Sequence, residues 1–212
     1  MQFVLKYLKI SCSKVGLQNL PHSFSLAQHG LILFQQDQFI DMNIDLLFSE
    51  WVYQFYFLKD VAEIFSGRVF SGILVASIGI YFFKIKKFKI FLFLCLATGF
   101  GDLTGNILKD FFSQPRPCFN YHENFPMIEK CGSDLTGMPS NHTLNFFLFS
   151  TLVHLFLRQP SISFIFFASS VLVALSRVLL IKHLLSQVII GGLIGIVMAK
   201  IFFEAYIKWK KS

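Results

Sequence analysis

Long apolar runs separated by short polar turns dominate the chain between residues 67 and 203. A hydrocarbon core of about 30 Å requires roughly 20 apolar residues in helical form to cross it. Because lipid offers the backbone no hydrogen-bond partners, each such run is expected to form a helix. Five runs approach the required length, and they cover residues 67–84, 88–107, 139–157, 161–178 and 184–203. The pattern therefore predicts an all-α fold, a polytopic transmembrane helical bundle.

The first 66 residues follow a different pattern. Residues 1–20 form a basic amphipathic stretch, and residues 23–36 are apolar in part but are interrupted by Gln28 and His29. If this second segment crosses the membrane, the bundle has six spans and a cytoplasmic N-terminus; otherwise it has five spans and the N-terminus lies outside. Residues 37–63 mix acidic, aromatic and aliphatic side chains, which is typical of an amphipathic helix lying in the membrane interface.

Three aspartates in this interfacial region recur at every fourth position, on one face of a helix. They are Asp37, Asp41 and Asp45. We interpret this face as solvated, with a metal site built from the three carboxylates as the alternative. The rest of the sequence shows no spacing typical of metal ligands, so no metal and no cofactor are expected.

Composition agrees with a membrane protein. Hydrophobic residues make up 54% of the chain and charged residues 15%, with a mean hydropathy of +0.60. A soluble domain of this size seldom combines these values. The net charge of +7 does not indicate a nucleic-acid partner, because the basic residues lie in loops between apolar runs. Nothing in the sequence indicates an obligatory protein partner.

Basic residues in three short segments predict the orientation. They are Lys84, Lys86, Lys87 and Lys89, then Arg158, and finally Lys208, Lys210 and Lys211. In the predicted bundle all three segments fall on one side of the membrane, which the positive-inside rule makes cytoplasmic. The 108–138 loop and the 177–183 turn then face the opposite side.

Three clusters of ionisable residues lie at the outer ends of the predicted spans, where such residues are functional candidates by default. One runs from Lys109 to Pro117, the second from Gly137 to His142, and the third from Ser176 to His183. Arginine and lysine bind phosphate oxygens, and a helix N-terminus offers free N–H groups to an anion. Two histidines can divide nucleophilic attack and protonation of the leaving group between them. The clusters therefore predict a site that handles phosphate.

The order and spacing of these motifs, Lys-x6-Arg-Pro, Pro-Ser-x-His and Ser-Arg-x5-His, resemble the type 2 phosphatidic acid phosphatase family over about residues 67–203. The resemblance implies His183 as the nucleophile that forms a phosphohistidine and His142 as the acid and base. The implied phosphate contacts are Lys109, Arg116, Ser140, Asn141 and Arg177. The implied supporting residues are Pro117, Pro139 and Ser176. It also implies that the enzyme needs no metal.

Two positions depart from the family pattern. Asn141 stands where the family often has glycine, and Gln187 stands where it usually has an aspartate that holds the other ring nitrogen of the nucleophile. An amide oxygen of Gln187 can accept the same N–H. Asp102 lies seven residues before Lys109, on the same helix face. We hypothesise that Asp102 pairs with Lys109 or replaces the missing aspartate near His183.

Two cysteines, Cys118 and Cys131, flank the outer loop between the first two motifs. If that loop lies in an oxidising compartment such as the periplasm, these cysteines can form a disulfide.

The sequence thus indicates three regions, an interfacial N-terminal region over 1–66, a catalytic transmembrane domain over 67–203 and a basic cytoplasmic tail over 204–212. The resemblance implies a phosphatase in a bacterial inner membrane, with its site facing the periplasm and a lipid phosphate as its partner. The expected substrates are undecaprenyl diphosphate, phosphatidylglycerol phosphate and the phosphates of lipid A. The alternatives are a lipid phosphotransferase, a phosphatase for soluble phosphate esters, and a catalytically silent lipid-binding membrane protein.

Overall fold

The computed structural model of the protein describes residues 44–128, 131 and 135–211. Within these residues all regular secondary structure is helical. The basic stretch at 1–20, the uncertain span at 23–36 and the first two of the three aspartates lie outside the described residues.

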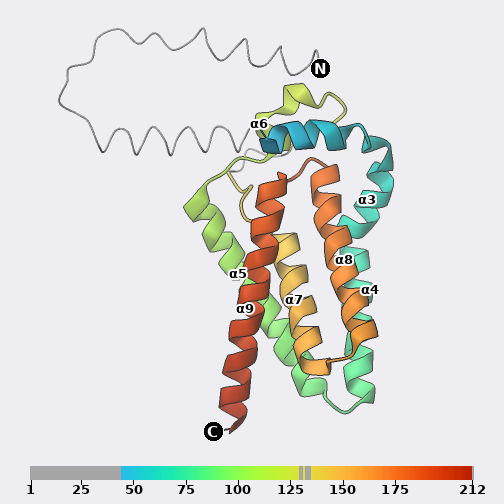
Figure 1. Ribbon diagram of the computed structural model, residues 1–212, viewed down its shortest axis with the longest axis vertical. Coiled ribbons are helices and arrows are strands. Elements are labelled where there is room, and N and C mark those ends of the chain that lie inside the picture. The colour runs from blue at the N-terminus through green and yellow to red at the C-terminus, as the bar shows by residue number, and fades with distance from the viewer. Residues whose placement is uncertain (1–43, 129–130, 132–134, 212) are drawn as a thin grey trace, which may run out of the picture. The chain divides into compact units, whose positions relative to one another are not determined.

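Five long helices form the bundle (Figure 1). They are α4 (Arg68–Lys84), α5 (Phe88–Phe112), α7 (Asn141–Leu157), α8 (Pro160–Leu179) and α9 (Leu185–Lys211). The shorter elements are a helical segment at 44–53, η1 (Tyr56–Leu58), α3 (Lys59–Ser66), α6 (Pro117–Asn120) and η2 (His122–Asn124). The long helices coincide closely with the five apolar runs, so the predicted all-α fold is confirmed.

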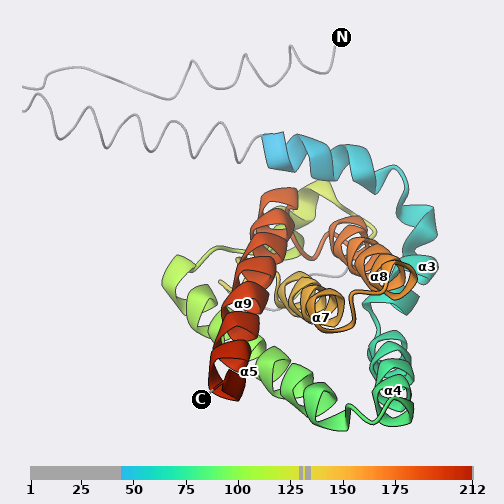
Figure 2. The same ribbon diagram turned by 60° about the horizontal axis from the view of Figure 1, so that its bottom comes forward.

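Three of the long helices, α5, α8 and α9, are long and apolar enough to cross a membrane by themselves. The segment Tyr56–Ser66 and α4 qualify as a fourth span if the pair, bent by 41°, counts as one. α7 has 17 residues and lies among α5, α8 and α9 (Figure 2). The total of five to six spans therefore stays a prediction.

α7 forms the centre of the bundle. Leu144, Leu148 and Leu152 recur at every fourth position and are fully buried, as expected for a helix enclosed by others. On α9, a Cβ atom at Gly195 would clash with the carbonyl oxygen of Leu144. Glycine at this position therefore allows the two helix backbones to approach closely, as small residues do between membrane helices.

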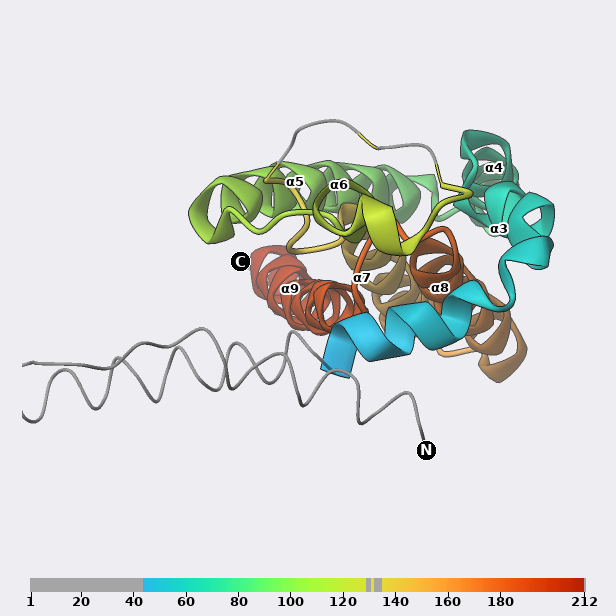
Figure 3. The same cartoon turned by 90° about the horizontal axis from the view of Figure 1, so that it is seen from above.

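The basic segments lie at one end of the bundle. Figure 1 shows the α4–α5 turn, the α7–α8 turn and the C-terminus at the same end. The prediction that these three segments share one side is confirmed. The opposite end carries α3, α6 and the helical segment at 44–53, and Figure 3 looks down on it.

The helical segment at 44–53 contacts the outer turns of the bundle. The Asp45 carboxylate accepts a hydrogen bond from the Ser186 backbone N–H at the start of α9, over 3.1 Å. The Glu50 carboxylate accepts one of 2.8 Å from the Asn124 side chain. Residues from 42 onward belong to one compact unit, so the described part of the 1–66 region packs on the bundle as part of that unit.

A disulfide joins Cys118 and Cys131, which confirms the predicted pairing. Cys118 lies in α6, directly after the loop that leaves α5. Phe125, between the two cysteines, is fully buried and packs edge-on against the Tyr53 ring. The disulfide therefore braces the part of the outer loop that follows Arg116.

Candidate active site

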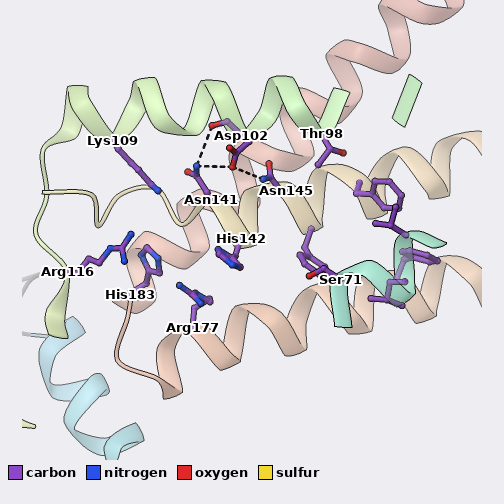
Figure 4. A pocket seen from close by; sticks show the side chains of 15 residues that line it. Ser71, Thr98, Asp102, Lys109, Arg116, Asn141, His142, Asn145, Arg177 and His183 are labelled. Carbon is purple, nitrogen blue, oxygen red and sulfur yellow. Dashed lines mark hydrogen bonds between the residues drawn. The ribbon is translucent and has the colours of Figure 1, made fainter. Parts of the chain in front are cut away.

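A pocket of about 490 Å³ lies at the outer end of the bundle, among α4, α5, α7 and α8. Side chains from all three sequence motifs line it, and they are Lys109, Arg116, His142, Arg177 and His183. Figure 4 shows Lys109, Arg116, Arg177 and His183 gathered at one end of the pocket, with Ser71 and Thr98 toward the other end. The remaining walls are apolar, from Leu74, Val75, Phe146, Phe149 and Phe166. The predicted convergence of two imidazoles and three cations is confirmed.

His183 lies in the turn between α8 and α9 and is only 2% exposed. Its Nδ1 atom lies 2.8 Å from the carbonyl oxygen of Gly137. Because a carbonyl can only accept a hydrogen bond, Nδ1 must carry the ring proton in a neutral imidazole. The other ring nitrogen, Nε2, then has a free lone pair, as a nucleophile requires.

Burial lowers the pKa of the His183 imidazole well below its ordinary value, and the positive charges of Arg177, Arg116 and Lys109 lower it further. The hydrogen bond to the Gly137 carbonyl acts in the opposite direction and does not overcome these effects. The ring is therefore neutral at pH 7, with a free lone pair on Nε2.

Gln187 does not hold the His183 ring, so this part of the prediction is wrong. The side chain is fully buried, and its Oε1 accepts a hydrogen bond of 3.2 Å from the Leu184 backbone N–H. Its Nε2 donates one of 3.2 Å to the Pro115 carbonyl oxygen. The loop that carries Gly137 supplies a backbone carbonyl to the ring instead.

Gln187 acts on the neighbouring loop that carries Arg116. Its Nε2 also lies 3.4 Å from Oε1 of Gln114, and the Gln114 carbonyl accepts a 2.7 Å hydrogen bond from the Gly137 N–H. Arg116, two residues after Gln114, occupies the N-cap position of α6, whose first residue is Pro117. Proline is suited to this position because it needs no N–H partner and its φ is already helical. These contacts fix the chain on both sides of the guanidinium.

Arg177 lies in the last turn of α8 and is 6% exposed. One terminal guanidinium nitrogen donates a hydrogen bond to the Ser66 hydroxyl at the end of α3. The Nε–H is buried and has no hydrogen-bond partner among the described residues. Since a buried, unsatisfied donor is costly, this group is suited to a phosphate oxygen in the pocket.

Ser140 and Ser176 both make hydrogen bonds within the protein. Ser140 is fully buried; its backbone N–H donates to the Gln187 carbonyl over 3.1 Å, and its hydroxyl accepts a hydrogen bond from Thr143. The Ser140 amide is therefore engaged within the protein, and its expected contact with phosphate is wrong, whereas a phosphate contact from its hydroxyl stays a prediction. The Ser176 hydroxyl donates to the carbonyl of Val173 in its own helix.

The Asp102 carboxylate and the His183 ring have different hydrogen-bond partners. Its Oδ1 accepts hydrogen bonds from the side-chain amides of Asn141, over 3.2 Å, and Asn145, over 3.0 Å. The hypothesis that it replaces the missing aspartate near His183 is therefore wrong. It also forms no ion pair with Lys109, because the single ion pair among the described residues lies elsewhere. Asn141 thus points to α5 and not to the phosphate end of the pocket.

Two contributors to the site escaped the sequence analysis. The Gly137 carbonyl could not be recognised, because a backbone oxygen has no sequence signature. Asn145 did have a signal, since it follows Asn141 by four residues and lies on the same helix face. Among the described residues no three His, Cys, Asp or Glu side chains gather in a way that could hold a metal ion.

The family model of the PAP2 superfamily matches residues 90–211. The chain belongs to the PAP2 superfamily. The structure of this PAP2 protein is similar to the crystal structure of the first transmembrane PAP2 type phosphatidylglycerolphosphate phosphatase from Bacillus subtilis, with a TM-score of 0.61 and 20% sequence identity. The match covers 86% of this chain and 96% of the other, and it shows a shared fold. No curated protein matches the sequence.

Proposed function

We propose that this PAP2 protein is a lipid phosphatase that hydrolyses the phosphomonoester or diphosphate of an envelope lipid through a phosphohistidine. The observation that carries the proposal is the pocket itself, in which two imidazoles and three cations meet at one end while the walls beyond are apolar. The cationic end suits a phosphate dianion, and the apolar walls suit an acyl or prenyl chain.

In the first step, Nε2 of His183 attacks phosphorus. A nitrogen–phosphorus bond forms, and the bond between phosphorus and the leaving oxygen breaks. The negative charge of the bound phosphate favours the protonated form of His142, which lines the pocket, and this imidazolium gives its proton to the leaving oxygen. The cations, Lys109, Arg116 and Arg177, hold the three equatorial oxygens, on which negative charge is spread in the transition state.

In the second step, water attacks the phosphohistidine. Neutral His142 takes a proton from the water, a new oxygen–phosphorus bond forms, and the nitrogen–phosphorus bond to His183 breaks. Inorganic phosphate leaves and the starting protonation state returns. The positive side chains supply the charge neutralisation throughout, so the proposed reaction needs no divalent metal.

Phosphate release from a panel of lipid phosphates, with a chelator present, tests the proposal. The substitution His183→Ala should reduce release by at least about 1,000-fold, because it removes the nucleophile. His154→Ala is the matched control, since His154 lies at the other end of α7 and contacts the Ser163 hydroxyl. Labelled phosphate should be trapped on His183 in the wild type.

Several outcomes would contradict parts of the proposal. Normal release by the His183→Ala variant would refute the phosphohistidine, and loss of activity with the chelator would refute metal independence. Transfer of phosphate to an added alcohol in preference to water would indicate a phosphotransferase. No release from any lipid, with release from a soluble ester, would refute the lipid substrate.

The proposed location is the inner membrane, with the site facing the periplasm. It is supported by the basic segments at the end of the bundle opposite the pocket. A reporter protein that fluoresces only in the cytoplasm, fused after Ser212, should therefore be fluorescent in cells. An intact fusion without fluorescence would indicate the opposite orientation.

A further inference from the structure

Asp102 is the single carboxylate among the described residues that line the pocket. An α-helix rises about 1.5 Å per residue, so the Cα atoms of Asp102 and Lys109, seven residues apart, lie roughly 10 Å apart along α5. Figure 4 shows Asp102 between the cationic end of the pocket and Thr98. A lipid with its phosphate at the cations therefore passes this carboxylate on the way to the apolar walls.

The carboxylate is held in place by amides from two helices. Asn141 and Asn145 donate to Oδ1 from α7, and Asn106 donates to Oδ2 from α5 over 3.4 Å. Asn141 Nδ2 also donates to Asn106 Oδ1 over 2.7 Å. A Cβ atom at Gly105 would clash with the Asn141 amide, so glycine is needed for this approach.

The amides leave part of the carboxylate unsatisfied. An ionised carboxylate has about four acceptor sites, and Oδ2 receives only the long hydrogen bond from Asn106. The side chain is exposed to the pocket, and no cation of the described residues lies within ion-pair distance of it. A charged group at this depth is costly, and a hydrogen-bond donor on the ligand would satisfy it.

We propose that Asp102 selects lipid phosphomonoesters whose leaving alcohol carries a neutral hydrogen-bond donor, a hydroxyl or amide N–H, within a few bonds of the phosphate. This inference rests on the proposed lipid phosphatase function. A substrate without such a donor displaces water from Oδ2 and leaves it unsatisfied, which weakens binding of the transition state. The second phosphate of a diphosphate meets repulsion from the same carboxylate.

Phosphate release from paired lipids in mixed micelles tests the selection. Phosphatidylglycerol phosphate offers a hydroxyl in its leaving alcohol, whereas phosphatidic acid offers no donor; an acylated amino-sugar phosphate offers both hydroxyl and amide, whereas a polyprenyl diphosphate offers neither. The wild type should show kcat/KM at least about tenfold higher for the donor lipids. A higher kcat/KM for the third lipid than for the first would indicate that the amide adds to the effect of the hydroxyl.

The substitution Asp102→Ala should lower kcat/KM about 10- to 100-fold for the donor lipids, less than threefold for phosphatidic acid, and raise it for the diphosphate. Asp102→Asn keeps the shape of the side chain and should remove the discrimination against the diphosphate. Asp110→Asn is the matched control, because Asp110 lies on the same helix but does not line the pocket.

Equal losses on phosphatidic acid and on the donor lipids would show a merely structural role and overturn the inference. A wild type that releases phosphate from phosphatidic acid without preferring donor lipids would overturn it while leaving the proposed function intact. Absence of release from all four lipids would overturn both.

Discussion

Replacement of Gln187 by leucine tests whether the site depends on a buried amide that does not itself line the pocket. The change removes the hydrogen bonds to the Leu184 N–H, the Pro115 carbonyl and the Gln114 side chain. A buried backbone N–H without a partner costs about 1–3 kcal/mol, and each of the other bonds contributes about 0.5–1.5 kcal/mol. Since leucine fills a similar volume, little cavity cost is added. The free energy of unfolding should fall by about 2–6 kcal/mol.

The same change should loosen the loop that precedes Arg116, and kcat/KM should fall about tenfold for every lipid, since a small displacement of a phosphate ligand costs transition-state binding. Unfolding in mixed detergent micelles gives the first quantity and phosphate release gives the second. Gln159→Leu is the matched control, because Gln159 is exposed and its side chain accepts a single hydrogen bond, from the Tyr81 hydroxyl. This substitution should cost less than about 0.5 kcal/mol. Equal destabilisation by the two substitutions would refute the reasoning.

Three further predictions concern stability. The pKa of His183 is lowered in the folded protein, so below about pH 6.5 the unfolded chain binds a proton that the folded chain does not. The free energy of unfolding should therefore fall as the pH decreases. In acid titrations, His183→Asn should make this fall less steep. Reduction of the Cys118–Cys131 disulfide opens the loop that the bond closes in the unfolded chain, so the free energy of unfolding should fall by about 3 kcal/mol in denaturation experiments. An unchanged midpoint would show that the bond adds no stability. Asp45→Ala removes the carboxylate from the Ser186 N–H at the start of α9 and should cost about 1 kcal/mol, whereas no cost would show that water replaces it.

Much of the fold could be predicted because a membrane constrains local sequence strongly. Each long helix coincides with an apolar run, and its ends coincide with charged or turn-forming residues such as Lys84 and Pro160. Hydrophobic length and helix geometry are local properties of the chain. Successive spans cross the membrane in opposite directions, so the order of the spans predicted that the three basic segments lie at the same end.

The site could be predicted in its composition but only partly in its contacts. Lys109, Arg116 and Arg177 belong to motifs with defined spacing, and they do meet at one pocket. Ser140 belongs to such a motif as well, yet its amide and hydroxyl face other parts of the protein. Motif spacing identifies which residue types are present and does not state which atoms remain free for a ligand.

The amino-acid order alone therefore determined that this chain forms membrane helices, which end of the bundle carries the basic segments, and which imidazoles and cations are available. Only the tertiary structure decided that a backbone carbonyl at Gly137 holds the His183 ring, that Gln187 supports a loop, and that amides hold Asp102. The physical reason is that hydrogen-bond partners are chosen by distance and direction between segments remote in the chain. Hydrophobic length, in contrast, is a sum over neighbouring residues.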